Sequence, residues 1–187
     1  MPNDGSRLIE TLYLVRQMLS DGMKVSPNAS SLEVTQAVLT LDLAVDIVAT
    51  MLLTPQGQQT SPETLDKRFP KKIQDACGRH QQLQSRQQEI LDFHIYRNHV
   101  THRGLDPQYA RLAEMRPHIE WFLDSAARIL VGKGIMEITL AFLVNDQELR
   151  SRLQLAEQRL ADGYPGGAAE LAAEAFVAGW NKLQAEL

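Results

Sequence analysis

The sequence has little of what makes several other classes of protein recognisable. Its 187 residues include a single cysteine, Cys77, which excludes an internal disulfide and leaves no cysteine partner for a zinc site. Aromatic residues make up only 6% of the chain, so aliphatic side chains must supply the core. There is no Gly-rich phosphate loop, no Gly-x-Ser-x-Gly elbow and no His-Glu-x-x-His pair. These absences argue against the enzyme classes that depend on those motifs.

Targeting signals are also lacking. No run of about 18 or more apolar residues is present, and residues 1–5 lack the basic and apolar regions of a signal peptide. A hydrophobic fraction of 44% and a charged fraction of 22% are ordinary for a globular protein. We therefore expect a cytoplasmic protein that does not bind membranes.

What the chain does contain is helical periodicity. Apolar residues recur at helical spacing along most of its length, and no segment alternates with strand period for long enough to indicate a sheet. The pattern predicts an all-α fold, with an antiparallel helical bundle over residues 1–133 and a C-terminal helical extension over 134–187.

Several helix ends can be predicted from local signals. Ser30 and Glu33 form a capping-box pattern at the start of a strongly apolar helix. A long helix is expected from Arg79 to Arg103, because Gly104 is the first residue to interrupt it. The next helix should start at Asp106-Pro107 and be kinked or split at Pro117. In the extension, Asn145 or Asp146 should cap one helix, a turn is expected at Tyr164-Pro165-Gly166-Gly167, and the last helix should span residues 168–187.

Charge is unevenly placed along the chain. Residues 67–103 hold eight basic and three acidic residues, a net charge of +5, whereas the formal charge of the whole chain is −4. A local basic face could therefore bind a polyanion without making the whole protein adhesive to nucleic acid. The residues assigned to such a nucleic-acid-binding face are Lys71, Lys72, Arg79, Arg86, His99 and Arg103.

The run Arg97-Asn98-His99-Val100-Thr101-His102 concentrates chemistry in less than two helical turns. A guanidinium is a permanently charged fork that suits phosphate, and an imidazole exchanges protons near neutral pH. These are the groups that a nuclease needs if it uses no metal. We take Arg97, Asn98 and His102 as candidate catalytic residues, with no cofactor and no metal site.

Together with an early apolar helix and a following Asp-Pro helix start, this run resembles the HEPN superfamily, the higher-eukaryote and prokaryote nucleotide-binding all-α domains. The resemblance covers residues 6–133. The family signature is an Arg followed after four to six residues by a His, commonly with a polar residue beside the Arg, and Arg97, His102 and Asn98 match these three positions. The resemblance implies a homodimer in which two copies of the motif face one cleft. Many members of this family are similar in being RNases that need no metal. They cut RNA by attack of a ribose 2′-hydroxyl on the neighbouring phosphate.

In that interpretation Arg97 braces the phosphate, His102 transfers protons and Asn98 orients either of them. Such a protein would be an endoribonuclease of bacterial stress or antiviral defence, including toxin–antitoxin systems. One departure is Gly104, which stands where the best-known toxin branch of the family has a tyrosine. Residues five apart on an ideal helix also differ by about 140° in direction, so Arg97 and His102 do not share one face.

Other interpretations stay open. The motif residues could satisfy helix ends and loop carbonyls, or His94, His99 and His102 could contribute to a metal site. The chain could also be a non-catalytic helical dimer that binds a protein or a nucleotide. Phe176 and Trp180 lie four residues apart, on one face of the last helix, and could contact a protein partner there.

Overall fold

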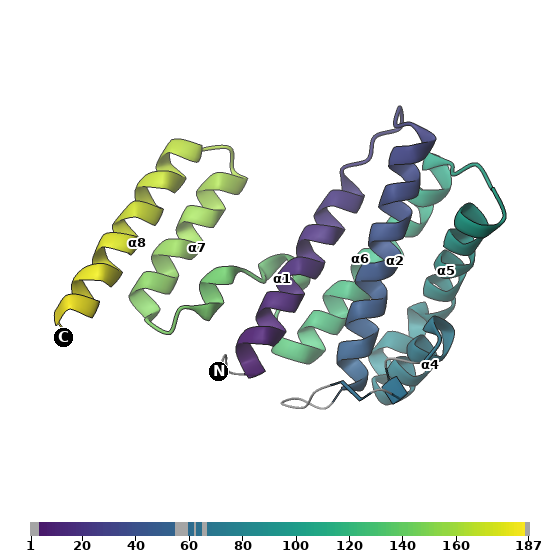
Figure 1. Ribbon diagram of the computed structural model, residues 1–187, viewed down its shortest axis with the longest axis horizontal. Helices are drawn as coiled ribbons and strands as arrows, with labels where there is room; N and C mark the ends of the chain where they lie inside the picture. Colours follow the sequence, from purple (N-terminus) through teal and green to yellow (C-terminus); the bar gives the residue numbers. More distant parts are fainter. Residues whose placement is uncertain (1–3, 55–59, 62, 65–66, 186–187) are drawn as a thin grey trace. The chain divides into compact units, whose positions relative to one another are not determined.

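The protein is all-α, as the periodicity predicts. The structure is a computed structural model that describes residues 4–54, 60–61, 63–64 and 67–185, and these residues contain no strand. They divide into two compact units, Met1–Ile138 and Thr139–Leu187, which are described separately. The first unit contains α1 (Asp4–Met23), α2 (Ser31–Leu53), α4 (Phe69–Arg79), α5 (Gln87–His102) and α6 (Tyr109–Val131), with 3₁₀ turns at Gln81–Arg86 and Ile135–Glu137 (Figure 1). The second unit contains a 3₁₀ turn at Leu140–Leu143, then α7 (Gln147–Ala161) and α8 (Pro165–Ala185).

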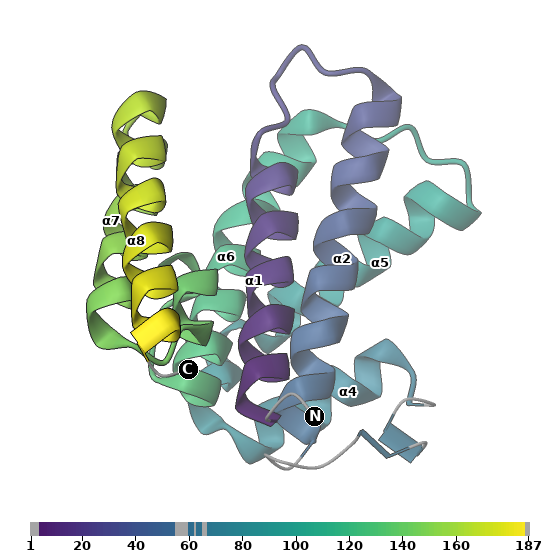
Figure 2. The ribbon, with the colours of Figure 1, turned by 60° about the vertical axis from the view of Figure 1, so that its left-hand side comes forward.

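Helix α2 is the core of the first unit. Its start confirms the capping box: the Glu33 N–H donates to Ser30 Oγ (3.3 Å) and the Ser30 N–H donates to the Glu33 carboxylate (2.7 Å). The bonds from Ser30 also lower the pKa of Glu33. Helices α1 and α2 run side by side in Figures 1 and 2, and α4, α5 and α6 also pack against α2. The buried residues of α2 are therefore distributed around much of its circumference.

By length and composition, α2 is also long and apolar enough to cross a membrane. Over half of its most apolar 18-residue window, 56%, is buried inside the protein. The core helix of a globular bundle meets the same length and composition criterion.

The first unit ends later than the expected boundary at residue 133. Ile135 and Ile138 are fully buried in its core. The Ile135 N–H donates to the Asp124 carboxylate (3.0 Å), and Arg16 Nη1 donates to the Ile138 carbonyl (2.6 Å). Two buried isoleucines and two hydrogen bonds thus hold this short segment on the bundle, and the boundary falls at Ile138.

The prediction of one long helix from Arg79 to Arg103 is wrong, because α4 ends at Arg79 and a 3₁₀ turn precedes α5. The Gln-rich stretch offers one buried apolar side chain, Leu83, too few for an amphipathic helix. The Leu83 N–H donates to the His80 carbonyl (2.9 Å), and the Leu83 carbonyl accepts a hydrogen bond from the Cys77 thiol (3.7 Å). The C-terminal signal is confirmed, since Gly104 adopts a left-handed φ of 66° just beyond α5.

The expected start of α6 is also wrong. The helix begins at Tyr109, after Asp106-Pro107, because the Asp106 carboxylate accepts a hydrogen bond from Ser31 Oγ (2.7 Å) and does not cap α6. Pro117 does not split the helix. Apolar residues are buried on both sides of the proline, including Met115 and Ile119, and this packing keeps the helix continuous.

The second unit is a helical hairpin. Asp146 caps α7, as expected, by accepting the Leu149 N–H (3.0 Å). Lys182 of α8 donates to Asp146 (2.7 Å) and Glu148 (3.1 Å), and so lowers the pKa of both carboxyls. The hairpin loses this contribution only in acid, as the pH falls through the lowered pKa values. Helix α8 begins at Pro165, earlier than expected, because proline suits the first helical position.

We expect Gly22→Ala to destabilise the first unit by about 1–3 kcal/mol, because it over-packs a closed core. A Cβ at Gly22 would lie 2.5 Å from Leu41 Cγ, and Leu41 is fully buried. Gly78→Ala is the matched control: nothing lies within 4 Å of its Cβ position, and loss of a helical glycine should stabilise by about 0.5–1 kcal/mol. Urea unfolding of both variants measures the difference, and equal effects would contradict the close α1–α2 contact.

Burial also predicts the reactivity of Cys77. Desolvation raises the pKa of its thiol to about 11, so almost no thiolate is present at pH 8 in the folded state. We expect the thiol to react with a disulfide reagent at least about 100-fold more slowly in buffer than in 6 M guanidinium. Because folding favours the neutral thiol, this group costs stability only as the pH rises above its unfolded pKa. Fast labelling of the native protein would show that Cys77 is accessible.

Candidate functional site

Two carboxylates inside the core helix organise the site. Asp42 and Asp46 lie one turn apart on α2, and Asp42 is buried. Asp42 Oδ1 is 2.9 Å from His94 Nδ1, and its Oδ2 is 3.3 Å from Arg97 Nε. The second contact is a charge contact without hydrogen-bond geometry, because Arg97 Nε is buried and forms no hydrogen bond. Sequence reasoning missed both carboxylates, although two acids at this spacing in an apolar helix are a usable signal.

His94 is fixed by two contacts, the bond to Asp42 and a parallel stack on Phe69 of α4. The ring centroids of His94 and Phe69 are 4.0 Å apart, and the planes differ by 5°. His94 therefore supports the Asp42–Arg97 contact from one side.

The structure brings Arg97 and Asn98 together. Arg97 Nη1 donates to Asn98 Oδ1 (3.0 Å), while the Arg97 carbonyl accepts from Thr101 Oγ1 (2.9 Å). The Arg97 side chain is 29% exposed, and its Nη2 has no hydrogen-bond partner among the described residues. The guanidinium is thus held at Nε and Nη1 and retains one nitrogen for an external anion.

The last turn of α5 carries the rest of the motif. His102 and Arg103 are exposed, His99 is half-buried, and none of these side chains has an ion-pair or hydrogen-bond partner in the described part of the chain. Successive residues turn by about 100°, which places Asn98 between Arg97 and His102 around the helix. Because Asn98 holds the guanidinium, it draws Arg97 toward the side of α5 that carries His102.

The other four residues assigned to the basic face are engaged internally. Lys72 is buried, with Nζ 3.0 and 2.9 Å from the two oxygens of Asp46. Lys71 pairs with Asp75 (2.7 Å), and together with Lys67 it lowers the pKa of that carboxyl. Arg86 pairs with Glu89 (3.0 Å), and Arg79 donates to the Leu53 carbonyl (2.8 Å). The structure therefore does not gather all the predicted basic residues on one unpaired face.

An exposed apolar strip adjoins the motif. Helices α2 and α5 run in opposite directions, since Ser31 at the start of α2 bonds Asp106, which follows α5. Leu43 of α2 follows Asp42 and is 53% exposed, and Ile95 of α5 follows His94 and is 49% exposed. Each of these residues comes one position after a member of the Asp42–His94 contact, which turns its direction by about 100° around its helix. Because the two helices are antiparallel, both turns lead to the same side of the helix pair. Asn98 and His102 emerge on that side of α5 as well.

Among the described residues, no group of three or more His, Cys, Asp or Glu side chains is placed to hold a metal ion. Compared with protein-family models, curated proteins and solved structures, the chain matches none. The case for function therefore depends on the arrangement of these residues.

We expect Asp42→Asn to destabilise the first unit by about 1–3 kcal/mol, because it removes the anionic partner of a buried guanidinium nitrogen. The control is Asp92→Asn on α5, where the carboxylate is exposed and bonds only Gln88 (2.9 Å). This control should stay within about 0.5 kcal/mol of the parent protein. Urea midpoints at an unchanged unfolding slope give both values, and an Asp42→Asn variant as stable as Asp92→Asn would show that Asp42 does not hold Arg97.

Proposed function

We propose that the protein is a HEPN-like, RNA-binding homodimer that acts as a metal-independent endoribonuclease. The observation that carries this proposal is the state of Arg97: two of its nitrogens are fixed by Asp42 and Asn98, and the third is left for an external phosphate. A positioned cation and an unengaged imidazole in one motif suit phosphodiester cleavage. Bacterial stress or antiviral defence is the setting that the resemblance implies, and it is part of the proposal.

The residues suit an internal transfer reaction. The ribose 2′-hydroxyl would attack the adjacent phosphorus, the bond to the 5′-oxygen would break, and a 2′,3′-cyclic phosphate and a 5′-hydroxyl would result. Arg97 Nη2 would stabilise the charge that develops on the phosphate oxygens, and His102 would take up the 2′-hydroxyl proton or deliver one to the leaving oxygen. Arg103 and His99 would bind neighbouring phosphates.

Two copies suit the site better than one. Arg97 and His102 differ by about 140° in direction, and α5 stays helical through His102. The strip of Leu43 and Ile95 lies beside Asn98 and His102, and pairing two such strips would bury the exposed apolar surface. It would also bring His102 and Asn98, the side chain that holds Arg97, from both copies into one interface.

A second candidate function is a non-catalytic dimer that binds a protein or a nucleotide. It is favoured by the contact of Arg97 with the buried Asp42 carboxylate, which offsets its charge. Helix-stabilising arginines are often held in this way. The two functions differ in whether RNA is cut, and the same variants decide between them.

We expect the wild-type protein to cut a mixed RNA pool in EDTA and to leave 2′,3′-cyclic phosphate ends. Loss of a positioned proton-transfer group typically costs about 10²–10⁴ in rate, so His102→Ala should lose most activity, and Arg97→Ala should lose a comparable factor. His80→Ala is the matched control, because His80 lies in the turn after α4 and should retain full activity. A folded dimeric wild type that cuts no RNA would favour the non-catalytic module.

Mixing the two inactive variants tests the composite site. If Arg97 and His102 come from different copies, mixed dimers of Arg97→Ala and His102→Ala contain one intact site, and about a quarter of the activity should return. No recovery would place each site within one copy.

Leu43→Lys should separate the dimer in sedimentation and abolish cleavage, because it puts a charge in the strip formed by Leu43 and Ile95. A Leu43→Lys monomer with full activity would contradict a shared cleft.

A further inference from the structure

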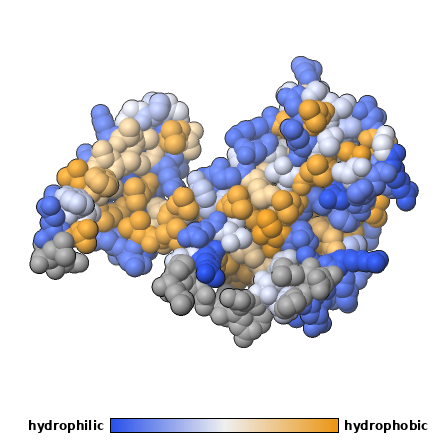
Figure 3. Space-filling view, in the orientation of Figure 1, coloured by the Kyte–Doolittle hydropathy of each residue, from blue (hydrophilic) through white to orange (hydrophobic). Residues whose placement is uncertain are grey.

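The outer face of α8 is a long apolar surface. We define it by seven exposed apolar residues at helical spacing, Ala169, Ala172, Ala173, Phe176, Val177, Trp180 and Leu183. Figure 3 shows apolar surface over α7 and α8. Phe176 is 72% exposed and Trp180 is 52% exposed. The neighbouring side of α8 packs on α7 through buried Ala168 and Ala175, and Ala169 and Ala172 line a groove that also includes Leu153 and Leu160 of α7. The hairpin therefore buries small residues between its helices and exposes its large apolar residues. A helix that faces only solvent has polar residues at such exposed positions.

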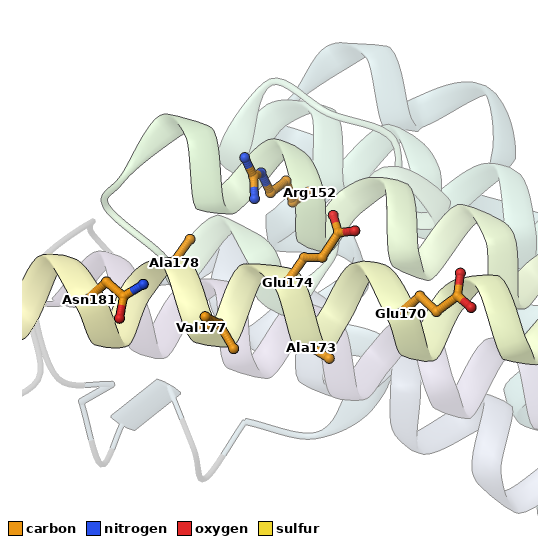
Figure 4. A pocket seen from close by; sticks show the side chains of 7 residues that line it. All are labelled: Arg152, Glu170, Ala173, Glu174, Val177, Ala178 and Asn181. Atoms are coloured by element: carbon orange, nitrogen blue, oxygen red, sulfur yellow. The ribbon is translucent and has the colours of Figure 1, made fainter.

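A groove borders this face. Its volume is about 580 Å³, and α8 supplies most of its lining, with Arg152 from α7 above it (Figure 4). Ala173 and Val177 form its apolar side, while Glu170 and Glu174 project along the other side. The apolar face thus has an acidic rim formed by two glutamates one turn apart.

The charges of α8 are asymmetric. Between Pro165 and Ala185 the helix has three charged residues, and Lys182 is bound to Asp146 and Glu148 of α7. Arg152 is paired with Glu148 as well (2.8 Å). Glu170 and Glu174 have no ion-pair partner among the residues that the structure describes. The charge that α8 offers to a ligand is therefore purely negative.

We infer that the outer face of α8 binds an amphipathic helix whose apolar stripe is flanked by lysine or arginine. The face runs from Ala169 to Leu183, about 21 Å at 1.5 Å per residue, which matches a helix of about four turns. The alanines at its beginning allow a close approach of a second helix, and Phe176 and Trp180 supply the aromatic anchors that dominate such interfaces. The acidic rim selects a basic flank.

The probe for this site is a fluorescein-labelled 16-residue peptide of leucine and lysine with helical period, compared with a peptide that has glutamate in place of lysine. Binding to the full chain is measured by fluorescence anisotropy at 0.15 M salt, where long-range attraction is screened. We expect the basic peptide to bind at least tenfold more tightly than the acidic one. Phe176→Ser combined with Trp180→Ser should weaken binding at least tenfold, because it removes both anchors.

The rim is tested by Glu170→Gln combined with Glu174→Gln, which should reduce the preference for the basic peptide about three- to tenfold. Its matched control is Glu10→Gln combined with Glu120→Gln, which removes two exposed charges from the first unit and should leave the preference unchanged. Equal losses in the two double variants would show nonspecific attraction to an acidic protein and overturn the proposal. All these side chains are exposed, so urea unfolding should confirm that each variant folds.

The emission of Trp180 gives a second readout in a Trp121→Phe background, where it is the remaining tryptophan. A blue shift on addition of the basic peptide is expected, because docking removes the indole from water. Two results would overturn the proposal: a Trp180 that is already shielded from iodide in the isolated protein, and a self-associated chain that Phe176→Ser with Trp180→Ser makes monomeric. Either would mean that this protein itself covers the face.

Discussion

The first unit depends on how two carboxylates are accommodated in its core helix. Asp42 and Asp46 lie on the most buried helix of the bundle, and a buried charge without a partner is strongly destabilising. Their partners come from two other helices, with Lys72 on α4 and both His94 and Arg97 on α5. These contacts help to set the rotation of α5 about its own axis, and that rotation decides which side chains of the motif reach solvent.

Local signals predicted much of this fold, because they depend on a few neighbouring residues. The capping box at Ser30, the cap at Asp146 and the left-handed glycine after α5 are all such cases. Other features of the fold, which local signals did not predict, involve distant partners. Asp106 bonds Ser31, 75 positions away, and its role as a cap is lost. The contact between Asp42 and His94 joins residues 52 positions apart, and no local pattern could pair them.

Counting charges along the chain overestimated the basic surface for a related reason. The segment 67–103 carries an excess of positive charge, but most of its cations serve the fold. Lys72, which is buried, neutralises Asp46, and Arg79 satisfies a carbonyl at the end of α2. A lysine whose charge is paired inside the protein cannot bind a polyanion at the surface. Arg103, His99 and His102 are therefore the more informative residues for the proposed RNA binding, because nothing in the described structure engages their side chains.

The two units present surfaces of opposite character, and this difference would sort the two proposed ligands. The end of α5 offers cations and imidazoles, which attract phosphate and repel a basic helix. The outer face of α8 offers apolar area with an acidic rim, which attracts a basic helix and repels a polyanion. Each surface thus disfavours the ligand of the other through like charge, and this is how specificity is obtained when two sites share one chain. RNA and a basic amphipathic helix could then be bound by one protein without competition.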